Sequence, residues 1–153
     1  MQPDVNIVKL VLQDRMRFEA SDQRGATAML DAAPPGGEGA GMTPMEFLLA
    51  GLGGCTAMDV ITILRKQRQV VTDYRLEITG TRAVEHPKPY AAIIIRHTVT
   101  GYNISEEAVR RAIELSVEKY CPAHVMLSKA ATISTTFEVR SEEPVLATPI
   151  ANA

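Results

Sequence analysis

The sequence predicts an α+β fold in which an antiparallel sheet packs on helices. Alternating apolar residues indicate short strands near both ends of the chain, and a long apolar run lies between them. A second helical pattern precedes the last strand. The resulting order, β-β-β-α-β-β-α-α-β, is typical of α+β proteins with antiparallel strands.

The first three strands are expected to form an antiparallel meander. Apolar side chains recur along residues 5–12 and alternate along residues 16–20, the SDQRG sequence at 21–25 has the composition of a turn, and residues 26–31 can form a third strand. Residues 32–42, AAPPGGEGAGM, follow as a flexible loop rich in proline and glycine. Such loops often border functional sites.

Residues 43–68 are predicted to form a long central helix. Thr43 and Glu46 have the spacing of a capping box, and Pro44 suits the first helical position. Apolar or small residues then fill nearly every position up to Leu64, as in a helix that is buried on all sides. One small subunit has too little material to cover such a helix, so we expect an intertwined homodimer.

The same run is long enough to cross a lipid bilayer. Asp59 near its centre and Glu46 near its start argue against that arrangement, as do its three glycines. The rest of the chain has the alternating patterns of a water-soluble domain. We therefore expect no membrane-spanning segment.

The second half of the chain supplies the remaining elements. We expect strands at 74–79, 90–100 and 133–139, a helix capped by Ser105, and a short helix at 122–129. Pro122 cannot continue the preceding helix but suits the start of a new one. Without an internal repeat, the sequence predicts one domain at 1–140 and a C-terminal tail at 141–153.

Composition excludes several functional classes. The chain has 153 residues, 46% of them hydrophobic and 22% charged, with a formal net charge of −2. It lacks the clustered basic residues of a nucleic-acid-binding surface, so no nucleic-acid partner is expected. The N-terminal segment lacks the features of a secretory signal, so we expect a cytoplasmic protein whose two cysteines are reduced.

The two cysteines are the strongest candidates for chemistry. Cys121 lies at or next to the start of a predicted helix, where backbone N–H groups favour negative charge. Cys55 lies inside the central helix, directly after glycines that would let another backbone or a small substrate approach closely. A purely structural role as a buried core residue remains the alternative for Cys55.

Two motifs resemble the OsmC/Ohr family of thiol-dependent hydroperoxide reductases. They are TPMEFLLAGLGGC, with Pro44, Ala50, Gly51 and Cys55 at matching positions, and KYCPAHVML, which contains Cys121. The resemblance covers nearly the whole chain and implies an OsmC-like fold. It also implies that Cys55 attacks an organic hydroperoxide and forms a sulfenic acid, that Cys121 converts it to a disulfide, and that an external dithiol reduces this bond.

The chain departs from the family pattern beside the motif. Family peroxidases have a glutamate directly after the motif's proline, which orients an arginine that keeps the reactive thiolate charged. Here that position is Met45, while Glu46 is explained by helix capping. The helper arginine is absent from residues 26–42, and Arg17 and Arg24 are interpreted as ordinary solvated side chains. The alternative function is therefore a redox-sensing or small-molecule-binding dimer without efficient peroxidase activity.

A metal site is a further alternative. Cys121 and His124 have a C-x-x-H spacing, and with Cys55 they offer three zinc ligands. Because no fourth ligand is evident, we expect neither a metal nor another bound cofactor.

Overall fold

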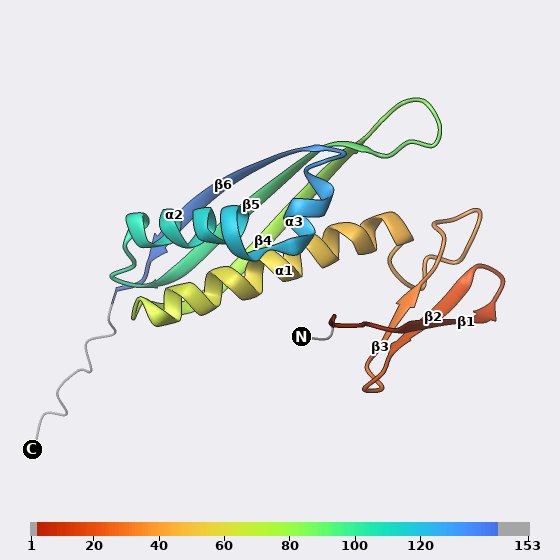
Figure 1. The fold of residues 1–153 in the computed structure, drawn as a ribbon, viewed down its shortest axis with the longest axis horizontal. Coiled ribbons are helices and arrows are strands. Elements are labelled where there is room, and N and C mark those ends of the chain that lie inside the picture. Colours follow the sequence, from red (N-terminus) through yellow and green to blue (C-terminus); the bar gives the residue numbers. More distant parts are fainter. Residues whose placement is uncertain (1–2, 144–153) are drawn as a thin grey trace, which may run out of the picture. The chain divides into compact units, whose positions relative to one another are not determined.

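A computed structural model describes residues 3–143, and its elements follow the predicted order (Figure 1). The chain forms two compact units that meet in sequence between Ala50 and Gly51, inside helix α1 (Pro44–Lys66). The mixed α+β class is observed. Residues 144–153 of the predicted tail lie outside the described part, and Ser141 is the last residue of strand β6 (Thr132–Ser141).

The first unit contains the predicted antiparallel meander. Strands β1 (Val8–Asp14), β2 (Arg17–Asp22) and β3 (Thr27–Leu30) pair in sequence order, with Leu10 opposite Ala20 and Ala20 opposite Ala28. All seven residues of β1 are exposed, although four of them are large and apolar. This strand therefore presents apolar side chains that the described chain leaves uncovered.

The loop after β3 is held by one buried carboxylate. Asp31 accepts hydrogen bonds from the backbone N–H groups of Ala32, Glu38 and Ala40, at 2.8, 3.2 and 3.0 Å. These bonds hold the pKa of Asp31 below its ordinary value, led by the bond from Ala40. The Gly- and Pro-rich segment is thus anchored at several points along its length.

The second unit contains a sheet of β4 (Val70–Arg82), β5 (Tyr90–Tyr102) and β6, in that order. Strands β4 and β5 pair antiparallel, as predicted, but β5 and β6 pair parallel, with Ile95 opposite Thr135. The prediction of an entirely antiparallel sheet is therefore wrong for this pair. Parallel neighbours need a long crossover connection, and the helices between β5 and β6 provide it.

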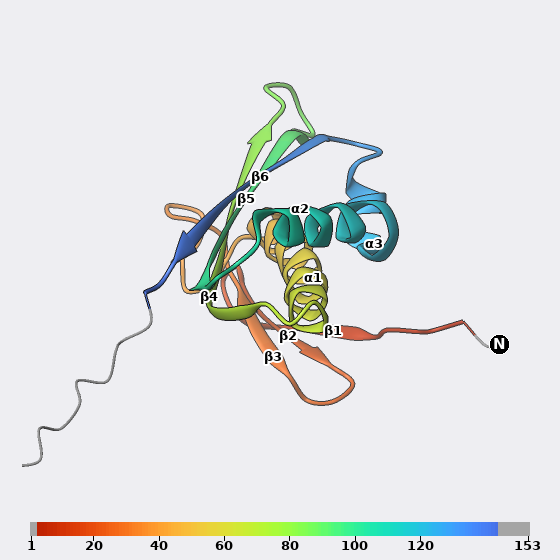
Figure 2. The ribbon, with the colours of Figure 1, turned by 90° about the vertical axis from the view of Figure 1, so that its left-hand side faces the viewer.

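Helices cover one face of this sheet. Figure 2 shows α2 (Glu106–Leu115), α3 (Pro122–Leu127) and the second-unit part of α1 on the same side of β4–β6. The core joins α1, β5 and α2 through buried apolar side chains, among them Val60, Leu64, Val99, Val109 and Ile113. At Gly53, an added Cβ would overlap the Ile78 side chain, so glycine allows α1 to pack closely on β4.

Within one chain, α1 is not buried on all sides. Its buried residues are Leu52, Gly53, Thr56, Val60 and Leu64, which follow one stripe, while Met58 is 71% exposed. Within the second unit, the sheet β4–β6 packs against one side of α1. By length and composition α1 is the one described helix that could span a bilayer, but it packs here in a core with strands and a second helix.

Local sequence signals set the helix starts. The Glu46 carboxylate accepts from the Thr43 N–H at 2.8 Å, and the Thr43 hydroxyl accepts from the Glu46 N–H at 3.3 Å, which confirms the predicted capping box. The Ser105 hydroxyl accepts from the Ala108 N–H at 3.2 Å and caps α2, also as predicted. Both helices thus begin where the residue pattern indicates.

Candidate functional site

The fold brings the two cysteines together. Cys55 lies on α1 and is half-buried, whereas Cys121 precedes α3 and is 1% exposed. Both are free thiols, and their sulfurs lie with a carboxylate oxygen of Asp59 in a group whose atoms are all within 4.8 Å of one another. We call these three residues the Cys55–Asp59–Cys121 cluster.

Cys121 is positioned by an unusual end to the second helical segment. After α2 the chain continues as a π-helical turn, η1 (Ser116–Tyr120), and the Cys121 N–H donates to the Ser116 carbonyl at 2.8 Å. π-helical turns are rare and are often found at functional sites. Cys121 then adopts an extended conformation and caps α3, as predicted, with its sulfur accepting from the His124 N–H at 3.4 Å.

Two side chains hold the cluster from either side. The Thr56 hydroxyl lies 3.5 Å from the Cys121 sulfur, which links α1 to the segment before α3. The Ser116 hydroxyl donates to the Asp59 carboxylate at 3.0 Å. Neither Thr56 nor Ser116 was predicted from the sequence as a site residue, because their contacts depend on the crossing of α1 with η1.

The surroundings of Cys55 favour the neutral thiol. Burial raises its pKa most, and the neighbouring Cys121 and the charge of Asp59 raise it further, while the Ala123 N–H lowers it. Within residues 3–143, no lysine or arginine is among the groups that shift this pKa. The groups of the described chain that shift the pKa of Cys55 thus include no cation that would stabilise its thiolate.

The arginines considered from sequence have other partners. Arg24 is highly exposed and pairs with Asp22 at 2.9 Å, which agrees with a solvated surface role. Arg17 pairs instead with Glu38 at 3.4 Å, and only 32% of its side chain is exposed. No sequence signal indicated Glu38, because this ion pair forms only when the loop folds back beside β2.

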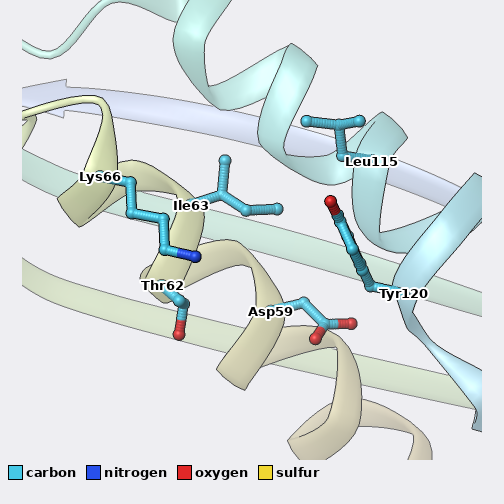
Figure 3. Close-up of a pocket in the computed structure, with 6 residues that line it drawn as sticks. All are labelled: Asp59, Thr62, Ile63, Lys66, Leu115 and Tyr120. Atoms are coloured by element: carbon cyan, nitrogen blue, oxygen red, sulfur yellow. The ribbon is translucent and has the colours of Figure 1, made fainter.

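A pocket of about 320 Å³ shares Asp59 with the cluster. It lies between α1 and the α2–η1 segment and is lined by Asp59, Thr62, Ile63, Lys66, Leu115 and Tyr120 (Figure 3). Its lining combines apolar side chains with one acidic and one basic group. The sequence held a signal for it, since the four α1 residues recur at intervals of three and four along an otherwise apolar helix.

His124 contributes its backbone to the site but not its ring. The imidazole lines a separate pocket with Arg110 and Phe137, and its Nδ1 has no hydrogen-bond partner among the described residues. Burial lowers the pKa of His124. The third group near the two sulfurs is Asp59 rather than the histidine of the C-x-x-H spacing.

Comparison with known proteins gives consistent matches. Residues 36–136 match a family described as OsmC-like protein. Protein YhfA of Escherichia coli (strain K12) is 43% identical over 97 residues, covering 63% of this chain and 72% of YhfA.

Solved structures share the fold over nearly the whole chain. A hypothetical protein from Aquifex aeolicus VF5 has a TM-score of 0.82 and 32% identity, covering 92% of this chain and 100% of that protein. The organic hydroperoxide resistance protein OhrB of Bacillus subtilis has a TM-score of 0.59 and 14% identity, covering 88% and 98%. At that identity OhrB indicates a common fold only.

Proposed function

Because the chain belongs to the OsmC-like protein family, we propose that it reduces organic hydroperoxides through Cys55 and Cys121. The observation that carries this proposal is the approach of two free thiols, from different elements, to within 4.8 Å. The chain would act as a cytoplasmic homodimer, without a bound cofactor, and an external dithiol would restore it.

The reaction would take place in three balanced steps. The Cys55 sulfur attacks the outer oxygen of the hydroperoxide, the O–O bond breaks, and the alcohol leaves with a proton while Cys55 becomes a sulfenic acid. The Cys121 sulfur then attacks the Cys55 sulfur, which forms a disulfide and releases water. A dithiol finally reduces the disulfide by exchange and is itself oxidised.

Some groups around the thiols favour these steps, and others slow the first one. The Ala123 N–H favours a charged Cys55 sulfur, and the His124 N–H bonds the Cys121 sulfur. The pocket beside Asp59 has apolar walls that fit the organic part of a substrate. The raised pKa of Cys55 leaves little thiolate at neutral pH, so the first step is expected to be slow.

That raised pKa also supports a second candidate, a redox-sensing or small-molecule-binding dimer. Met45 stands where the family resemblance places a glutamate, and the described neighbours of Cys55 include no cation that shifts its pKa. Such a protein would keep the two thiols but oxidise too slowly to clear a peroxide.

Stopped-flow oxidation separates the two candidates. The reduced protein is mixed with tert-butyl hydroperoxide or with hydrogen peroxide, and remaining thiols are counted over time, with Cys55→Ser as the control. The peroxidase predicts faster oxidation by the organic peroxide and steady turnover when dithiothreitol is present. Oxidation no faster than that of free cysteine would favour the second candidate.

A further inference from the structure

Asp59 has no evident use in thiol peroxide chemistry. It follows Cys55 by one helical turn, and its charge helps to raise the pKa of that thiol. The structure nevertheless orients it, through the hydrogen bond from Ser116 at 3.0 Å. A carboxylate held beside two thiols needs another explanation, and metal coordination provides one.

We propose that the reduced chain binds one zinc ion through the Cys55 and Cys121 sulfurs and an Asp59 carboxylate oxygen. Tetrahedral zinc with bonds of about 2.3 Å to sulfur and 2.0–2.2 Å to oxygen places its ligand atoms roughly 3.5–3.8 Å apart. The three atoms here already lie within 4.8 Å of one another, so small side-chain rotations bring them to that spacing.

The ligand types select the metal. Two thiolates exclude magnesium and calcium, which prefer oxygen ligands, and favour a thiophilic divalent ion such as zinc. Each thiol releases a proton when the metal binds, and the ion's two positive charges offset two of the three negative charges of the ligands.

The support around the ligands resembles that of a metal site. Ser116 holds Asp59, while Thr56 and the His124 N–H contact the Cys121 sulfur at 3.5 and 3.4 Å. Groups of this kind fix the orientation of metal ligands. Three protein ligands leave a fourth position for water. Figure 3 shows the Asp59 carboxylate directed from α1 toward Tyr120, on the opposite wall of the neighbouring pocket.

Zinc binding shares its two sulfurs with the proposed peroxidase but needs only reduced thiols. The bound ion would withhold both sulfurs from peroxide, so it acts as a reversible blocking ligand and has no part in the reaction. The two proposals can therefore fail independently.

The test is a titration of the reduced protein with Co²⁺ and then Zn²⁺ under nitrogen, without peroxide. We expect one ion per chain, a sulfur-to-cobalt charge-transfer band, and loss of that band when zinc displaces cobalt. Cys55→Ser and Cys121→Ser should each weaken the band. Asp59→Asn should keep the band but reduce the affinity at least about tenfold, and Ser116→Ala should reduce it by a similar factor.

His86→Gln, in the exposed turn between β4 and β5, is the matched control and should bind the metal as the wild type does. An unchanged affinity in Asp59→Asn, or an equal loss in His86→Gln, would overturn the assignment of ligands, and cobalt binding without a charge-transfer band would overturn the site. If a cysteine variant unfolds, the wild type still decides, since bound zinc should protect both thiols from iodoacetamide. Unprotected thiols at saturating zinc would refute the proposal.

Discussion

The Ser116 hydroxyl donates a hydrogen bond of 3.0 Å to the Asp59 carboxylate across 57 positions of sequence. Ser116 begins the π-helical turn that leads to Cys121, and Asp59 lies one turn after Cys55 on α1. The contact therefore joins the segment that carries one thiol to the helix that carries the other.

Oxidation should link Cys55 to Cys121. Treating the reduced wild type with one equivalent of tert-butyl hydroperoxide should give an intact mass lower by two hydrogen atoms, because the sulfurs already lie within 4.8 Å. Cys121→Ser should instead stop at a sulfenic acid on Cys55 that dimedone traps, or oxidise further. If Cys55→Ser consumes the hydroperoxide as fast as the wild type, the thiol mechanism is wrong.

The reactivity of Cys55 should rise at higher pH than that of a free cysteine. Burial, Cys121 and Asp59 all raise its pKa, so the thiolate forms only as the pH passes above the ordinary range. The rate of alkylation by iodoacetamide, measured against pH in Cys121→Ser, reports Cys55 alone. To separate the contribution of Asp59, the titration is repeated in that background with Asp59→Asn, which should move the profile to lower pH. Asp73→Asn, on β4 and paired with Arg75 at 2.6 Å, should leave the profile where it is.

Glu46→Gln should leave any peroxidase rate nearly unchanged. Glu46 is occupied by helix capping, with bonds of 2.8 and 2.9 Å from the Thr43 N–H and hydroxyl, and glutamine can keep that geometry. Thr43→Ala should lower the free energy of unfolding by about 1 kcal/mol through loss of the cap. A hundredfold slower peroxide reaction in a stably folded Glu46→Gln would show that Glu46 has taken the acidic role expected from the family.

The protein should be a dimer at micromolar concentration. One face of α1 and all of β1 leave large apolar side chains exposed in the single chain, among them Met58 at 71%. Size-exclusion chromatography with light scattering should give twice the chain mass. Met58→Glu should weaken the dimer, whereas Val84→Glu, in the turn between β4 and β5 and 89% exposed, should not. A monomeric wild type would contradict this prediction.

The stability of the fold should fall as the pH drops from 6.5 toward 4. His97 is fully buried and bonds the Tyr74 hydroxyl at 2.7 Å, and burial lowers its pKa to about 4. The unfolded chain, with an ordinary histidine pKa of about 6.5, binds a proton in this window that the folded chain does not. Urea unfolding at pH 7 and 5 should differ by about 2 kcal/mol from this group. His97→Gln should lose most of that difference, and His86→Gln, in the exposed β4–β5 turn, should keep it.

The sequence predicted the helices and strands better than it predicted how the strands pair. The order of strands and helices, the caps at Glu46 and Ser105 and the position of Cys121 before α3 all follow from local chemistry, which residue patterns record. The parallel pairing of β6 was missed because alternation is the same in either direction. The helices between β5 and β6 were the available signal, since they form a crossover connection.

The two thiols of the site could be predicted from the sequence, but the groups that hold the site in place could not. The two cysteines are candidates for chemistry on their sequence context alone, but Ser116 has the pattern of an ordinary helical residue, and only the π-helical turn brings it to Asp59. His124 was considered as a ligand because its spacing from Cys121 suits one. In the short helix α3, the backbone N–H of His124, rather than its ring, bonds the Cys121 sulfur.

The parallel pairing of β5 with β6 has a consequence for the synthesis of the protein on the ribosome. Strand β5 leaves the ribosome well before β6, which occupies its second edge, so that edge stays open while the helices between them are made. An open strand edge is a template for pairing with other chains. Nascent or truncated chains that end before β6 should therefore aggregate or depend on chaperones, even when both cysteines have already been synthesised.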